Sequence, residues 1–332
     1  MLCPGIDKRK IWVYIFPNKK QRRFGLCPKC LIFLPIIGKR ILMKTDFTKM
    51  EGCGNDYVYI DCVGGPEFEG DKSELARRIS DRHFGVGSDG LIFINKSPYA
   101  DFEMEMYNAD GSRGEMCGNG MRCVAKFVYD KGYTKDKRFR VESMGSIKNI
   151  EVFAKEGKAN LITVDMGEPI LEPRMIPIKD PGFDGPAINI PITAGEIRTK
   201  VTCVSMGNPH GVVFLDTMNL YSGDLKTLPI EKIGPAFENH EMFPKRTNTE
   251  FVEVVDYENV NMRVWERGSG ETLACGTGCC ATAVACVLNK RTGRDITVHL
   301  TGGDIKVRWD ERDNHIYMTG PARTVFEGTY EF

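Results

Sequence analysis

The sequence contains no long apolar run, and its charges cancel. The chain has 332 residues, with 45 Lys and Arg against 45 Asp and Glu. No stretch is long enough to span a bilayer, which takes about 20 consecutive apolar residues, so a membrane protein is not expected. This length favours about two domains. Hydrophobic residues make up 42% of the chain, enough for buried cores, and nothing in the composition indicates disorder.

The zero net charge hides an uneven distribution. Residues 1–42 hold ten Lys and Arg but a single Asp, so the remaining 290 residues carry a net charge of about −9. An acidic body argues against nucleic-acid binding, which relies on clustered positive charge. The segment beginning at Met43 reads like a normal protein start. We therefore expect residues 1–42 to be a dispensable extension that lies outside the fold.

The extension offers weak signals of its own. The apolar run 31–37 is only seven residues long, contains Pro35 and is followed by no small-residue cleavage site, so a secretory signal is not favoured. Cys27 and Cys30 could form half of a zinc site, but no second pair follows nearby. The twelve cysteines of the chain lack the regular spacing of a disulfide framework, which favours a reducing cytoplasm.

Short β-type runs dominate from Met43 onward and alternate with Gly and Pro turns, which predicts an α+β chain with much sheet. Three helices are predicted, at 73–82, 120–131 and 278–291. Strands are predicted at 46–50, 57–61, 91–95, 101–107, 139–143, 149–153, 161–165, 200–206, 212–215, 249–255, 260–265, 296–300, 304–309 and 315–319.

The two halves of the chain repeat one arrangement of motifs. Gly54-Asn55 and Gly207-Asn208 each precede an apolar run. Cys-Gly-x-Gly follows 63 residues after Gly54 and 68 residues after Gly207, each time before a helical pattern. Asn108 and Glu266 each lie nine residues before the cysteine of their half. Such a recurrence in register indicates a duplicated architecture that delivers one cysteine per half, Cys117 and Cys275.

Both cysteines are predicted to lie at helix N-termini, because the helical apolar spacing begins directly after them. Unpaired N–H groups and the helix dipole favour negative charge there. We therefore expect lowered thiol pKa values at both positions. The same N–H groups can hold a substrate carboxylate.

Two such thiols facing one carbon form a two-base racemising device. One thiolate removes the Cα proton and the other thiol returns a proton to the opposite face. This chemistry needs no pyridoxal, metal or flavin, and no motif for one is evident. The alternative for a lone cysteine is a structural core residue, which is our interpretation of the cysteines inside the helices: Cys123, Cys279, Cys280 and Cys286.

A third glycine motif, Gly85-Val-Gly-Ser-Asp-Gly90, matches the spacing of the dinucleotide-binding motif G-x-G-x-x-G. It follows a predicted helix and precedes a predicted strand, the reverse of the order in a Rossmann unit. We interpret it as a tight turn that borders the site.

Together these motifs resemble diaminopimelate epimerase. The matching stretches cover about 290 residues from Met43. They are GCGNDYVYID (52–61), RHFGVGSDGL (82–91), YNADGSRGEMCGNGMRC (107–123), SMGNPH (205–210), FPKRTNTEF (243–251) and WERGSGETLACGTG (265–278). The resemblance implies two similar domains, each a curved sheet wrapped around a central helix, with the active site in the cleft between them. It places the first domain at 43–161 plus 321–332 and the second at 162–320.

The resemblance also implies an activity. The reaction is the cofactor-independent interconversion of LL- and meso-2,6-diaminoheptanedioate, in lysine and peptidoglycan precursor biosynthesis. The enzyme is an isomerase, commonly a cytoplasmic homodimer, with no cofactor and no metal. Cys117 is the implied proton donor and Cys275 the acceptor, with His210 and Glu266 tuning their pKa values. The implied substrate-binding residues are Asn55, Asn108, Gly118, Asn119, Asn208, Asn248, Glu266, Arg267, Gly276 and Thr277.

The sequence leaves some alternatives open. Each asparagine could be a turn residue that satisfies local backbone, and His210 could merely begin a strand. Proline or hydroxyproline racemases resemble this chain but usually carry a histidine where it has Asn119, and they do not need Arg267, which is suited to grip a distal carboxylate. Phenazine-type isomerases lack the cysteine pair, and a zinc or regulatory module would use the cysteines differently. Many relatives carry glutamine at the position of Gly90, so a substrate contact from there is absent.

Overall fold

The computed structural model describes residues 44–114, 116–179, 182, 184–221 and 223–332. The interpretations of residues 1–42, including the Cys27–Cys30 pair and the apolar run, lie outside this range. All described residues belong to one unit, 42–332. Within them, no helix is long and apolar enough to cross a membrane.

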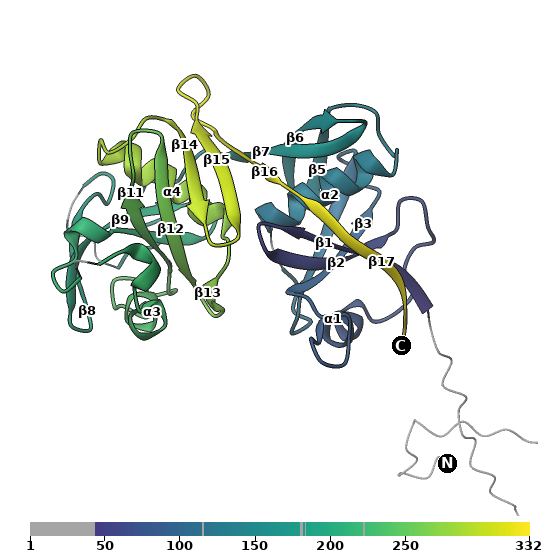
Figure 1. Ribbon diagram of the computed structural model, residues 1–332, viewed down its shortest axis with the longest axis horizontal. Helices are drawn as coiled ribbons and strands as arrows, with labels where there is room; N and C mark the ends of the chain where they lie inside the picture. Colours follow the sequence, from purple (N-terminus) through teal and green to yellow (C-terminus); the bar gives the residue numbers. More distant parts are fainter. Residues whose placement is uncertain (1–43, 115, 180–181, 183, 222) are drawn as a thin grey trace, which may run out of the picture. The chain divides into compact units, whose positions relative to one another are not determined.

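Strand pairing runs without a break through both halves of the chain (Figure 1). The hydrogen-bonded order is β17, β1 to β7, β16, β15, β14, β12, β11, β10, β9 and β8, with β13 beside β12. The first-half strands are β1 (Lys44–Gly52), β2 (Asn55–Asp61), β3 (Gly90–Asn95), β4 (Phe102–Asn108), β5 (Arg138–Ser143), β6 (Ser146–Lys155) and β7 (Lys158–Gly167). The others are β8 (Ile190–Ala194), β9 (Ile197–Ser205), β10 (Pro209–Phe214), β11 (Asn248–Val254), β12 (Asn259–Glu266), β13 (Gly270–Thr272), β14 (Asp295–Leu300), β15 (Gly303–Trp309), β16 (Ile316–Pro321) and β17 (Arg323–Glu331).

The two halves have the same topology. In the first half, β2 and β3 are parallel and are joined through α1 (Lys72–Ser80), while β4 and β5 are parallel and are joined through α2 (Gly118–Asp130). In the second half, α3 (Ile230–Glu238) joins parallel β10 and β11, and α4 (Gly276–Leu288) joins parallel β12 and β14. Parallel neighbours require such crossovers. The predicted α+β architecture of two similar halves is confirmed.

α2 and α4 form the centre of the main core, and each lies against the sheet of its own half (Figure 1). α2 buries the apolar positions that the helical spacing predicts, Met121, Val124, Ala125 and Val128. α4 is apolar nearly all round and is buried along most of its length, as a helix enclosed by a sheet must be. Both helices end one to three residues before the predicted limits.

Sequence patterns missed α3, β8, β13 and β17. α3 begins after Pro229 and contains Pro235, which removes a helical N–H donor and interrupts the pattern of a helix. Its stability comes from packing, because Phe237 is buried against Phe251 of β11 with ring centroids 5.3 Å apart. Two short 3₁₀ turns, Leu215–Thr217 and Leu225–Thr227, precede it.

Candidate active site

Cys117 lies immediately before the first turn of α2, as predicted. Its sulfur accepts a hydrogen bond from the Gly120 backbone N–H at 3.3 Å. The same thiol donates to Oδ1 of Asn55, 3.1 Å away at the start of β2. The first N–H groups of the helix have no partners inside it, so this end of α2 favours negative charge.

Cys275 holds the same position before α4. Its sulfur lies 3.5 Å from Oγ1 of Thr277, and the residue is 5% exposed. The cysteines inside the two helices are buried in the core, in agreement with the prediction that they are packing residues: Cys123, Cys279, Cys280 and Cys286. Each half therefore presents one cysteine at a helix start.

The expectation of lowered thiol pKa values is wrong. Burial raises the pKa of both thiols, because the loss of water disfavours the thiolate. At Cys117, helix N–H groups and the Tyr57 hydroxyl oppose this by hydrogen bonding to the sulfur, which lowers the pKa. At Cys275, the carboxylates of Glu266 and Glu250 add to burial and hold the pKa well above its usual value.

A cleft of about 970 Å³ contains both cysteines. Residues of both halves line it, including all of the site residues named from the sequence except His210 and Asn248. Those two are buried behind the cleft wall, His210 completely. The sequence-predicted residues that line the cleft are Asn55, Asn108, Cys117, Gly118, Asn119, Asn208, Glu266, Arg267, Cys275, Gly276 and Thr277.

A chain of hydrogen bonds connects the buried side chains of His210 and Glu250 to Cys275. Nδ1 of His210 lies 2.7 Å from Oε1 of Glu250, and Nε2 lies 3.0 Å from Oδ1 of Asn208. Nδ2 of Asn208 donates to Oγ1 of Thr277 at 3.3 Å, which in turn lies beside the Cys275 sulfur. His210, the second residue of β10, thus contacts both Glu250 and the cleft-lining Asn208. Sequence reasoning missed Glu250, whose only signal is a charge inside a buried strand.

Glu266 lies at the end of β12 and faces Cys275. Its carboxylate accepts a hydrogen bond from the Thr272 hydroxyl, and the residue lines the cleft together with Cys275. Burial raises the pKa of the Glu266 carboxyl, because the charged form is poorly solvated there. A carboxylate of this kind can take up the thiol proton.

Arg267 projects from the turn after β12 and is exposed to the cleft. Its backbone N–H donates to Oδ1 of Asn248 at 2.8 Å, so Asn248 positions the turn from behind. The guanidinium donates to the Lys245 carbonyl at 3.1 Å. The arrangement leaves a planar donor group at the mouth of the cleft, which suits a carboxylate.

Glu238, which sequence reasoning also missed, supports the same turn. This residue is 5% exposed at the end of α3. Its carboxylate accepts from Nε1 of Trp265 at 2.7 Å, from Arg246 at 2.8 Å and from the Gly268 N–H at 3.0 Å. These bonds fix the backbone on both sides of Arg267.

The asparagines have different surroundings. Nδ2 of Asn119 donates to Oδ1 of Asn55 and to the carbonyl of Ala274, each at 3.3 Å, and so links the two halves. Asn108, by contrast, donates to Oγ of Ser112 at 2.9 Å, within a local turn. Asn108 therefore fits the turn interpretation as well as the binding one.

The glycine-rich loop 85–90 borders the cleft, as predicted. Oδ2 of Asp89 accepts from Nδ2 of Asn55 at 2.7 Å and so orients the amide next to Cys117. At Gly90 a Cβ would lie 2.2 Å from the Tyr107 carbonyl oxygen, so no side chain fits there.

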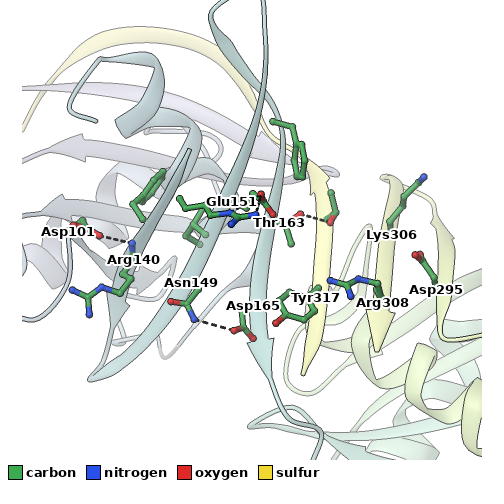
Figure 2. A pocket seen from close by; sticks show the side chains of 15 residues that line it. Asp101, Arg140, Asn149, Glu151, Thr163, Asp165, Asp295, Lys306, Arg308 and Tyr317 are labelled. Atoms are coloured by element: carbon green, nitrogen blue, oxygen red, sulfur yellow. Dashed lines mark hydrogen bonds and ion pairs between the residues drawn. The ribbon is translucent and has the colours of Figure 1, made fainter. Parts of the chain in front are cut away.

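A second groove, of about 750 Å³, crosses β5, β6, β7, β16 and β15 (Figure 2). Several of its polar groups already pair with one another. Thr163 and Thr319 hydroxyls are 2.6 Å apart, and Asn149 donates to Asp165 at 3.2 Å. It contains neither cysteine, so it is not the candidate active site. In the described part of the chain, no group of three His, Cys, Asp or Glu is placed to hold a metal ion.

Comparison with known proteins gives a consistent family. The family described as diaminopimelate epimerase matches residues 47–172 and 202–325. Diaminopimelate epimerases of Methanococcus maripaludis and Acetivibrio thermocellus are each 52% identical over 282 residues, 85% of this chain and 98% and 97% of theirs. A probable proline racemase structure from Agrobacterium radiobacter is similar in fold, with a TM-score of 0.64 at 14% identity over 86% of this chain and 92% of that one. The chain therefore belongs to the diaminopimelate epimerase family.

Proposed function

We propose that this chain interconverts LL- and meso-2,6-diaminoheptanedioate without a cofactor, by exchanging the proton on one α-carbon between two thiols. The observation that carries the proposal is the pair of cysteines at the starts of two repeat-related helices, both open to one cleft. The names of the curated relatives supply the substrate. The reaction serves lysine and peptidoglycan precursor synthesis.

In one direction, Cys275 removes the proton and Cys117 delivers one to the opposite face of the carbon. Glu266 contributes by accepting the Cys275 proton beforehand, since it lines the cleft beside that thiol and burial raises the pKa of the carboxyl. In the other direction the two thiols exchange roles, because an epimerisation must be reversible. General acid–base groups of this kind contribute about 10²–10⁴-fold each.

The substrate α-carboxylate is held between the two helix starts. Gly118 and Asn119 at one helix start, and Gly276 and Thr277 at the other, line the cleft and carry backbone N–H groups. They provide donors where negative charge spreads in the carbanion-like transition state. Asn55, which accepts from the Cys117 thiol, and Asn208, which donates to Thr277 beside Cys275, complete this end of the site.

The distal end of the substrate is an amino acid too. Arg267 binds its carboxylate and Glu266 lies close enough along the same turn to meet its ammonium group. Asn248 acts through Arg267, and Asn108 and Asn119 supply further polar contacts. His210 sets the orientation of Asn208.

We further propose the domain limits 43–161 plus 321–332 and 162–320. Strand pairing supports them, because β17 returns to β1 of the first half while β7 and β16 pair where the halves join. The proposed homodimer has physical support in β17, an edge strand of nine residues that exposes Val325 and Phe326, since unprotected edges tend to be covered. A cytoplasmic location agrees with the free thiols of all described cysteines.

The decisive experiment is incubation with LL-diaminopimelate in D₂O. We expect meso product with deuterium at one α-carbon. A parallel reaction with L-proline tests the racemase alternative. Absence of both epimerisation and exchange, or faster racemisation of proline, would overturn the proposal.

A further inference from the structure

Tyr57 occupies in the first half the position that His210 occupies in the second. Each lies two residues after the asparagine that starts the motif, Asn55 or Asn208. Tyr57 is in register with the first residue of the parallel neighbour β3, and His210 with the first residue of the parallel neighbour β11. The two side chains are thus related by the internal repeat, although their chemistry differs.

The Tyr57 side chain faces α2 and the cleft. Alternate residues of a strand point to opposite faces, so Asn55 and Tyr57 share a face, and Asn55 accepts from the Cys117 thiol on that face. Tyr57 belongs to the core around α2, whereas Val58 belongs to the core around α1. Tyr57 is 6% exposed, lines the cleft and belongs to the core against which Cys117 packs. Its hydroxyl is among the groups that lower the pKa of the Cys117 thiol.

Gly90 makes room for this ring. A Cβ at position 90 would lie 2.9 Å from Cε1 of Tyr57. The Tyr57 ring therefore occupies the space beside Cys117 that a side chain at position 90 would need.

We propose that Tyr57 is the first-half counterpart of His210, a hydroxyl donor that stabilises the thiolate of Cys117. This rests on the proposed function only for its catalytic consequence. Burial and the nearby Cys117 and Asp89 charges raise the pKa of Tyr57 well above its usual value, so the phenol keeps its proton and acts as a donor throughout.

The surroundings of Cys117 and Cys275 then differ in their chemistry. The His210–Glu250 pair and Glu266 surround Cys275 with groups that accept protons, whereas Tyr57 can only donate a hydrogen bond to Cys117. Cys275 can therefore pass its proton to Glu266, whereas hydrogen-bond donation stabilises the thiolate of Cys117. The titratable and charged groups that surround it from other positions are Arg82, Asp89, Cys123, Glu266, Arg267 and Cys275.

Tyr57→Phe tests this inference, because it removes the hydroxyl and keeps the ring. Cys117 alkylation by iodoacetamide is followed across pH by peptide mapping of the full chain. A hydrogen bond to a charged group is strong enough that its loss raises the apparent pKa of Cys117 by about one to two units. At neutral pH we expect at least about tenfold slower labelling, since each unit lowers the thiolate fraction tenfold.

Tyr59→Phe is the matched control. Tyr59 lies on the same face of β2, but its hydroxyl lies beside Cys123 in the core rather than Cys117. We expect this variant to keep the wild-type Cys117 profile. Thermal melting of both variants shows that the fold is retained.

The labelling profile separates this inference from the proposed function. Identical Cys117 profiles for Tyr57→Phe and wild type overturn the inference even if the enzyme epimerises diaminopimelate. A shifted profile supports it even if diaminopimelate is not the substrate. An equal shift in Tyr59→Phe would also overturn it, because the effect would then be structural.

Discussion

Cys117 and Cys275 have the same helical position but different neighbours. Cys117 faces an amide oxygen and a phenol, and Cys275 faces Glu266 and lies near Glu250. A carboxylate disfavours a nearby thiolate, and a hydroxyl donor favours it. The two repeat-related thiols therefore lose their protons in different surroundings, which makes the site asymmetric at the residue scale.

Removal of either thiol should stop epimerisation. Cys117→Ala and Cys275→Ala are each expected to lose at least about 10²-fold in kcat, because inversion needs a base on one face and an acid on the other. Turnover assays on LL-diaminopimelate measure the loss, and circular dichroism checks the fold. Cys286→Ala, in the core of α4, is the control and should remain active. Near wild-type turnover in either of the first two variants would rule out the two-base mechanism.

Arg267→Lys should weaken catalysis on the two-ended substrate. Lysine keeps the charge but cannot reproduce the bidentate geometry. Loss of a charge-assisted pair costs about 1.5–3 kcal/mol, so kcat/KM on diaminopimelate should fall at least about tenfold. Cys117 alkylation should change little, because Arg267 is not bonded to either thiol. Unchanged kinetics on diaminopimelate would mean that another residue holds the distal carboxylate.

At the scale of elements, α2 and α4 present their N-termini to one cleft. Two thiols arranged to reach one carbon are also placed to react with each other. We expect diamide to oxidise Cys117 and Cys275 to a disulfide with loss of activity, and dithiothreitol to restore it. Peptide mapping of the inactive protein identifies the bond. Oxidised, inactive protein without a Cys117–Cys275 crosslink would contradict this prediction.

Residues on α3 and β11, outside the cleft, hold cleft-lining groups in place through hydrogen bonds. α3 carries Glu238, which bonds to Trp265, Arg246 and Gly268 and so fixes the turn that bears Arg267. β11 carries Glu250, which fixes His210. Elements outside the cleft thus determine the orientation of groups inside it, and their bonds to side chains distant in sequence leave no local pattern.

At the scale of the whole molecule, residues 1–42 should be separable from the enzyme. The family match begins at residue 47, and the extension carries a positive charge that the rest of the chain lacks. A chain beginning at Met43 should keep nearly full activity and a similar melting temperature. Activity assays and calorimetry compare the turnover and the melting temperature of the truncated chain with those of the full chain. Loss of most activity or of solubility on truncation would show that the extension belongs to the fold.

The sequence by itself determined the architecture and the place of the thiols. Periodic apolar spacing after Cys117 and Cys275, and the recurrence of Gly-Asn and Cys-Gly-x-Gly motifs, are local signals, so they predicted both helix starts and the duplication. Most strands followed from alternating or continuous apolar runs. The sequence did not predict α3, because Pro229 and Pro235 interrupt its helical pattern and only packing stabilises the helix.

Only the tertiary structure decided the electrostatics of the site. The helix N-termini suggested lowered thiol pKa values, but burial of both sulfurs outweighs the helix N–H groups, and burial depends on what the rest of the chain packs around them. The roles of Glu250, Glu238 and Tyr57 likewise depend on contacts between strands and helices that are far apart in sequence. Desolvation and long-range hydrogen bonds belong to the folded chain, and no sequence window contains them.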